Sequence, residues 1–260
     1  MTTRKTDLID LNADLGESFG PWTMGNDADM LSVVTSANVA CGGHASDPET
    51  MYRTLTSAKQ SGVIVGAHPG YADREGFGRR VIPMKPDEIA RMVASQIGAL
   101  QAVAKLAGTD VHYVKPHGAL ANLAARDHDV AQAIAQAIKS VGPHLSILAI
   151  SGTALEVEAG AANIDVYSEI FADRGYQPNG QLVPRDQPGA MIHDPHQAAA
   201  RIIGMLETGL MPTIGGDPIA LKAHSICVHG DGPAALAMAK SVRSELEGAG
   251  IRLKPFIAPS

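Results

Sequence analysis

Several short segments of the sequence place acidic, basic or histidine side chains directly after an apolar run. These segments are NADLGES, NVACGGHASD, GAHPGY, VKPHGA, SEIFADRG and VHGDGP. Their candidate functional residues are Asn12, Asp14, Glu17, His44, His68, Lys115, His117, Glu169, Arg174, His229 and Asp231. Imidazole and carboxyl groups transfer protons and bind metal ions, whereas lysine and arginine bind carboxylate or phosphate groups. The pattern predicts an active site that moves protons, binds a metal or binds an anion.

These residues also have structural explanations. Asp14 and Glu17 can each cap a following helix, and His68 can be a hydrogen-bonded structural histidine. His44 stands three residues after Cys41, which permits a metal pair, but a single Cys-x-x-His spacing is weak evidence for one. Lys115 is costly to bury without an anionic partner, so it implies a substrate anion or a neighbouring carboxylate.

Two common catalytic motifs are absent from the sequence. It contains neither a G-x-x-x-x-G-K-[ST] P-loop nor a G-x-S-x-G nucleophile elbow. The stretch Gly230–Ala235 fits G-x-G-x-x-A, but the chain ends about one βα unit later, which argues against a dinucleotide site. An anion-binding helix N-terminus and a plain tight turn both remain open for this stretch.

Composition excludes several classes of protein. With a net charge of −6 and no long basic run, the chain lacks the electrostatic footprint of a nucleic-acid-binding protein. No apolar stretch is long enough to span a membrane, and the N-terminus has no signal-peptide core. The two cysteines form no C-x-x-C pair, so we expect no disulfide scaffold and a cytoplasmic location.

Short apolar runs alternate with longer amphipathic runs along the whole chain, which is typical of parallel strands covered by helices. The expected strands are Leu8–Leu11, Ala37–Ala40, Val63–Ala67, Val111–Val114, Leu145–Ile150, Asp165–Ile170 and Ser225–His229. Caps and stops predict helices from Pro48 to Gly62, Pro86 to Gly108, Asp127 to Gly142, Pro195 to Gly209 and Pro233 to about Gly248.

The alternation of predicted strands and helices continues along the chain without a linker. Residues 1–260 are therefore expected to form one α/β domain. Seven strands favour a parallel β/α barrel, with an open doubly wound sheet as the alternative. Both architectures gather function at the carboxyl ends of their strands, where the candidate residues stand. Three irregular segments, Pro69–Pro83, Gly175–Ala190 and Leu210–Ala223, are expected to be lids or binding loops.

The motifs NADLGES, NVACGGHASDP, GAHPGYADREGFGRR, VKPHGALAN, SEIFADRGY and VHGDGP, taken in order, resemble those of the LamB/YcsF family. The resemblance runs from about Ile9 to Pro255. Members are described as the A-subunit of bacterial 5-oxoprolinase. The resemblance implies an irregular seven-stranded, TIM-like β/α barrel related to glycoside hydrolases and polysaccharide deacetylases. It also implies ATP-dependent opening of 5-oxoproline (pyroglutamate) to L-glutamate, together with 5-oxoprolinase subunits B and C.

Opening an unreactive lactam needs an activated carbonyl, a placed water molecule and a protonated leaving nitrogen. The implied cofactor is ATP with Mg²⁺, held by this chain or by a partner protein. We expect Asp14, His44, His68 and His117 to be catalytic. The expected substrate-binding residues are Asn12, Glu17, Lys115, Glu169, Arg174, His229 and Asp231.

Two alternative functions remain open. The chain can be a metal-dependent, deacetylase-like hydrolase in which Asp14, His44 and His68 hold the ion, although the H-x-x-x-H motif common in deacetylases is absent. It can also be a non-catalytic component that only binds 5-oxoproline.

Overall fold

The computed structural model describes residues 7–229 and 234–258. Seven parallel strands pair in the order β1-β2-β3-β4-β5-β6-β9, and β9 returns to pair with β1. Their bounds are Leu8–Leu15 for β1, Ser36–Ala40 for β2, Ile64–His68 for β3, Tyr113–Val114 for β4, Ser146–Ile150 for β5, Val166–Phe171 for β6 and Ser225–Val228 for β9. The closed barrel confirms the predicted fold class and excludes the open sheet.

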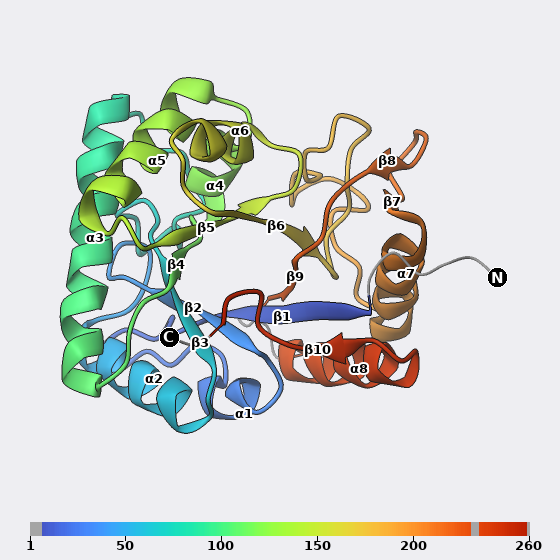
Figure 1. The fold of residues 1–260 in the computed structure, drawn as a ribbon, viewed down its shortest axis with the longest axis horizontal. Coiled ribbons are helices and arrows are strands. Elements are labelled where there is room, and N and C mark those ends of the chain that lie inside the picture. Colours follow the sequence, from blue (N-terminus) through green and yellow to red (C-terminus); the bar gives the residue numbers. More distant parts are fainter. Residues whose placement is uncertain (1–6, 230–233, 259–260) are drawn as a thin grey trace.

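Helices surround this barrel (Figure 1). The five predicted helices are α2 (Pro48–Gln60), α3 (Pro86–Ala107), α5 (His128–Val141), α7 (Pro195–Thr208) and α8 (Ala235–Gly248). Their end signals act as expected: the Asp47 side chain accepts a hydrogen bond from the Thr50 amide, and Gly108 ends α3 in the left-handed conformation. The predicted start of the last helix, Pro233, lies outside the described residues.

Three short helices add to the predicted set. They are α1 (Asp27–Leu31), α4 (Gly118–Ala124) and α6 (Ala154–Ala161). Each spans at most about two turns, which is too short for a 3.6-residue apolar period to stand out from the flanking loops.

The segment Leu210–Ala223, expected to be an irregular lid or binding loop, contains some regular structure. Two short strands, β7 (Leu210–Met211) and β8 (Ile219–Ala220), pair there as an antiparallel hairpin outside the barrel. A last short strand, β10 (Arg252–Leu253), pairs with the first residues of β1.

The first strand continues four residues beyond its expected end at Leu11. Asn12 pairs with Ser36 and Cys227, and Asp14 pairs with Asn38, so both residues lie within β1 instead of after it. Alternate side chains of a strand face opposite sides. The polar side chains therefore enter the barrel while Leu11, Ala13 and Leu15 join the surrounding apolar core. Polar residues in the barrel interior make this segment look like a loop in the sequence.

The barrel interior is divided into an apolar floor and a polar upper layer. Ile64, Tyr113 and Leu148 form a small buried cluster, and Phe256 of the C-terminal segment packs on Tyr113 with ring centroids 5.0 Å apart. The polar layer lies above this floor, toward the carboxyl ends of the strands, where the candidate residues gather. None of the helices in the described ranges is long and apolar enough to cross a membrane.

Candidate active site

A cavity of about 440 Å³ opens at the carboxyl ends of the strands. Most of the predicted site residues reach it. Its lining includes Asp14, His68, Lys115, His117, Glu169, Arg174 and His229. His44 lies directly behind this lining, buried against His117. The predicted residue Asp231 lies outside the described residues.

Lys115 is the centre of a buried charge network. Its Nζ lies 2.9 Å from Asp14 Oδ1, 2.8 Å from Glu169 Oε1 and 3.1 Å from Cys227 Sγ. Burial by itself would lower the lysine pKa, but the neighbouring carboxylates outweigh burial and raise that pKa well above its usual value. The structural requirement predicted for Lys115, an anionic neighbour, is thus met within the protein.

The two carboxyl groups beside Lys115 have different environments. Burial opposes ionisation of Asp14, yet His68 and Lys115 hold its pKa well below the ordinary value. Burial raises the pKa of Glu169, and Lys115 only partly offsets that rise. Asp14 is therefore the more firmly ionised of the two. Its position inside β1, with no helix following directly, excludes the alternative role of helix cap.

Two asparagines hold the network in place from below. Asn38 Nδ2 donates to Asp14 Oδ1 at 2.8 Å and to Asn12 Oδ1 at 2.7 Å, while its own Oδ1 accepts from the Tyr113 hydroxyl. Asn12 donates to Glu169 Oε1 at 3.0 Å. Asn12 is predicted from the sequence to contact substrate, but it is fully buried, hydrogen-bonded to Glu169 and Lys115, and is not part of the cavity lining. It positions the charged side chains instead.

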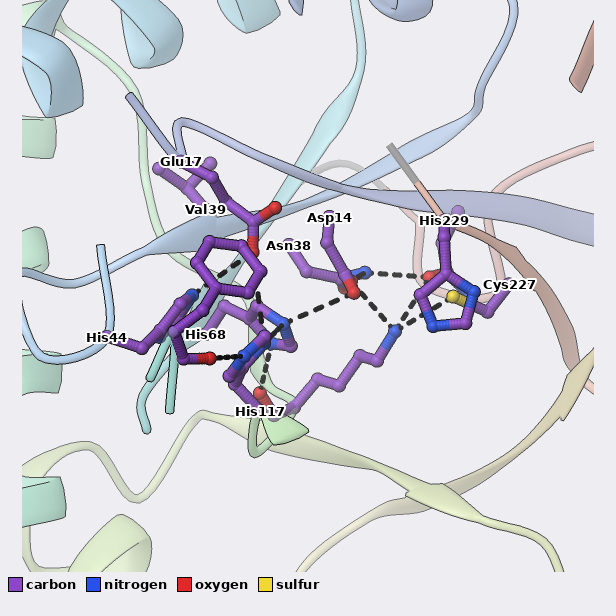
Figure 2. A network of polar contacts seen from close by, with 12 residues as sticks. Asp14, Glu17, Asn38, Val39, His44, His68, His117, Cys227 and His229 are labelled. Atoms are coloured by element: carbon purple, nitrogen blue, oxygen red, sulfur yellow. Dashed lines mark hydrogen bonds and ion pairs between the residues drawn. The ribbon is translucent and has the colours of Figure 1, made fainter. Parts of the chain in front are cut away.

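Three histidines and a glutamate pack together next to Asp14 (Figure 2). His68 Nε2 lies 3.4 Å from Asp14 Oδ2 and 3.0 Å from His117 Nδ1. The ring of His44 stacks on that of His117 with centroids 3.6 Å apart, and His44 Nε2 lies 3.1 Å from Glu17 Oε1. Burial, together with the other histidines, lowers the pKa of His44 and His117 well below the usual value. This buried set is called the histidine cluster below.

Glu17 is also predicted from the sequence to bind substrate, but it is not part of the cavity lining. Its side chain is buried behind the cavity lining, on His44. The metal ligands considered from the sequence are Asp14, His44 and His68. The structure instead groups His44 and His68 with Glu17 and His117, whose ligand atoms all lie within 4.8 Å of one another.

The LamB/YcsF family model matches residues 9–259. This chain belongs to the LamB/YcsF family.

Relatives of this LamB/YcsF member include a 5-oxoprolinase A-subunit of Pseudomonas syringae pv. tomato, which is 50% identical over 248 residues, 95% of this chain and 97% of that protein. The 5-oxoprolinase A-subunit of Gluconobacter oxydans is 51% identical over 252 residues, 97% of this chain and 98% of that protein. Among solved structures, the lactam utilization protein from Thermus thermophilus superposes with a TM-score of 0.89 at 43% identity, covering 95% of this chain and 98% of that one.

The cavity of this LamB/YcsF protein also has a cationic side. Arg79, Arg174 and Arg185 all line it. Arg174, predicted from the sequence, donates to the carbonyl oxygens of Ala190 and Val183, and burial followed by the nearby Arg185 lowers its pKa to about 10. It therefore fixes the loop that carries Arg185 while remaining charged at neutral pH.

The predicted residue His229 belongs to this cationic side. Its Nδ1 donates to Asp173 Oδ2 at 2.7 Å, and Arg185 Nη2 lies 2.8 Å from its Nε2. Sequence reasoning missed Arg79 and Arg185. The signal available was their position in the GFGRR and PRD stretches of two segments expected to be binding loops.

Proposed function

We propose that this chain takes part in the ATP-dependent hydrolysis of 5-oxoproline to L-glutamate, as one component of a 5-oxoprolinase that also contains subunits B and C. The names of the similar proteins support this proposal. The observation that carries it is the composition of the cavity: the acid–base pair Asp14–His68 shares one cavity with a set of arginines. A small anionic substrate whose ring must be opened by proton transfer needs both kinds of group.

The net reaction breaks the carbon–nitrogen bond of the lactam and joins a water oxygen to the carbonyl carbon. The ring nitrogen gains a proton and becomes the amino group of glutamate. ATP would activate the carbonyl oxygen by phosphoryl transfer with release of ADP. The phosphoryl group would end as inorganic phosphate, for which a second water molecule is consumed. The residues of this chain then have three tasks: holding the anions, directing the water and protonating the nitrogen.

The arginines hold the anions. Arg79, Arg174 and Arg185 line the cavity and suit the substrate carboxylate or a phosphoryl group, since guanidinium groups bind both through paired hydrogen bonds. Lys115 is expected from the sequence to share this task. Its ammonium group lies between Asp14 and Glu169, so we assign it to holding these two carboxyl groups instead.

Asp14 and His68 are positioned to direct water and move protons. Both line the cavity, and the Asp14 carboxylate lies 3.4 Å from His68 Nε2. Asp14 is the candidate for the group that orients water as a hydrogen-bond acceptor, because its pKa is held well below the ordinary value and it stays ionised. Protonation of the leaving nitrogen completes the ring opening.

Partner proteins are needed for the complete reaction in this proposal. The sequence contains no P-loop, the motif whose lysine and Ser/Thr bind phosphate and Mg²⁺. The segments Pro69–Pro83 and Gly175–Ala190 carry Arg79 and Arg185 to the cavity. We assign the partner contact to these two loops.

The proposal is tested by measuring glutamate and ADP release for this chain, for its partner proteins, and for the mixture. Coupled release is expected only from the mixture. Robust coupled release from the purified chain alone would contradict the shared arrangement. If the mixture releases glutamate equally fast with the Asp14→Asn chain and with the parent chain, this chain only binds 5-oxoproline.

A further inference from the structure

In the histidine cluster, two ring nitrogens face each other although neither carries a hydrogen when both histidines are neutral. His68 Nδ1 lies 2.7 Å from the carbonyl oxygen of Lys115, and His117 Nε2 lies 2.8 Å from the carbonyl oxygen of Phe77. A carbonyl oxygen only accepts, so each of these nitrogens carries a hydrogen. A neutral imidazole has a single N–H, which leaves a lone pair on His68 Nε2 and on His117 Nδ1.

These two lone pairs point at each other across 3.0 Å. Two acceptors at that separation repel unless a cation lies between or beside them. Histidines that bind metals show this same pattern, because a ligating imidazole usually donates its other N–H to a carbonyl or carboxylate, which fixes the tautomer. The Lys115 and Phe77 carbonyls thus prepare both rings as ligands.

The remaining two members of the cluster extend the site beyond a pair. Glu17 Oε1 lies 3.1 Å from His44 Nε2 and 3.8 Å from His117 Nδ1. The other nitrogen of His44 is buried and has no hydrogen-bond partner among the described residues. A proton shared between His68 and His117 would involve only those two rings, with His44 Nε2 donating separately to Glu17, whereas a metal ion would use all four side chains.

The spacing fits a four-coordinate ion. Metal–nitrogen and metal–oxygen bonds of about 2.0–2.1 Å in a tetrahedron place neighbouring ligand atoms about 3.3–3.4 Å apart. The observed separations of 3.0, 3.1 and 3.8 Å fall on both sides of that value. All four side chains are buried, so the ligand atoms are shielded from solvent.

We propose that Glu17, His44, His68 and His117 bind one divalent metal ion of the class that prefers imidazole, zinc foremost. The ring of His44 must turn away from its stack on His117 to direct Nε2 at the shared centre. This rotation breaks no hydrogen bond of His44 Nδ1, because that nitrogen has no partner among the described residues. Four protein ligands close the coordination sphere, which is typical of an ion that holds structure.

The ion ties together four segments that follow different strands. Glu17 follows β1, His44 follows β2, His68 ends β3 and His117 follows β4. The ion would therefore fix the part of the cavity lining formed by His68 and His117. This part lies beside Asp14, whose carboxylate is 3.4 Å from His68. Metal binding and stability are measured without substrate or partner proteins, so this site is tested separately from the proposed lactam chemistry.

The test uses the full-length chain, stripped with a chelator and then titrated with Zn²⁺. We expect one ion per chain by elemental analysis, a rise in Tm on zinc addition, and a tetrahedral ligand-field spectrum when Co²⁺ replaces zinc. Glu17→Gln and His117→Gln should each weaken zinc binding by more than about 10-fold, as losses of groups at a metal site do. His128→Gln is the matched control, since His128 is an exposed histidine outside the cluster and should bind zinc as the parent does.

Three outcomes would overturn the proposal. The first is a parent chain that takes up no zinc at micromolar concentration, which would leave a shared proton as the cation between His68 and His117. The second is zinc binding that survives both cluster substitutions. The third is an octahedral Co²⁺ spectrum. If a variant does not fold, the Co²⁺ spectrum and zinc stoichiometry of the parent decide by themselves.

Discussion

Lys115 and Glu169 face each other inside the barrel with Nζ 2.8 Å from Oε1, and their side chains are only 5% and 1% exposed. Asp14 flanks the same ammonium group at 2.9 Å. A buried ion pair contributes little net stability, but removal of one partner leaves an uncompensated buried charge. We therefore expect Lys115→Met to lower the free energy of unfolding by about 3–5 kcal/mol, measured by urea denaturation.

The double variant Lys115→Met/Glu169→Gln separates charge from packing. It removes one positive and one negative charge, so the net charge of the network is the same as in the parent. Most of the lost stability should return, while glutamate release by the reconstituted complex stays absent. If the double variant is no more stable than Lys115→Met, charge imbalance is not the cause of the loss.

Asp14→Asn should remove activity and keep the fold. The amide has the shape of the carboxyl group, and its oxygen still accepts from Lys115 and Asn38. Glutamate release by the mixture of subunits should fall at least about 100-fold, as is typical for the loss of a group that takes part in general acid–base catalysis. Circular dichroism and Tm should change little, because Glu169 still neutralises Lys115.

Asp165→Asn provides the control for this experiment, since Asp165 is exposed and lies before β6. It should retain parental glutamate release. An Asp14→Asn complex as active as the Asp165→Asn complex would remove Asp14 from the reaction.

Gly66 in β3 should not tolerate any side chain. A Cβ built there lies 2.2 Å from the ring of Tyr113, which is fully buried and anchored by its hydrogen bond to Asn38. Gly66→Ala is expected to destabilise the fold by about 1–3 kcal/mol through overpacking. Gly98→Ala is the matched control, because a Cβ on Gly98 in α3 meets no atom within 4 Å and should stabilise the chain by about 0.4–1 kcal/mol. Tm values of the two variants should move in opposite directions.

Asp10 makes stability depend on pH between about 4 and 6. Burial raises its pKa from 3.8 to about 6, although Ser225, Thr35 and Ser36 donate hydrogen bonds to it. The folded chain then binds more protons than the unfolded chain in this range, so this contribution to stability falls as pH rises. The loss amounts to roughly 3 kcal/mol between the two pKa values.

The comparison that isolates Asp10 is the parent against Asp10→Asn, by urea denaturation at a series of pH values from about 4 to about 7, which brackets both pKa values. The parent should lose stability relative to the variant as the pH rises through this range. A difference between the two that is independent of pH would contradict the raised pKa of Asp10.

Local signals explain why the barrel could be predicted. The strands are short apolar runs, and residues such as Asp47 and Gly108 mark helix ends through their own backbone preferences. The predicted strand bounds were wrong where polar residues lie within a strand. Asn12 and Asp14 are polar because they face a polar barrel interior, and from the sequence alone they look like loop residues.

The gathering of the candidate residues was predictable from topology, since parallel strands bring their carboxyl ends together. Individual partners were not predictable. For example, the Glu17 side chain contacts His44 and does not enter the cavity. Glu17 lies in a loop, and the sequence of a loop does not show in which direction its side chains point. The cavity contact of Arg185 likewise depends on the path of an irregular loop, for which no periodicity exists.

The pairing of β1 with β9 also has a consequence for synthesis of the protein. Asp10 lies opposite Ser225, and their side chains are hydrogen-bonded although the residues stand 215 positions apart. At about 5–20 residues per second, roughly ten to forty seconds separate translation of these two strands. During that time β1 has an unpaired edge on the ribosome, and the polar layer built on Asp10 and Asn12 lacks Ser225. We therefore expect the nascent chain to need protection from aggregation until its last barrel strand emerges.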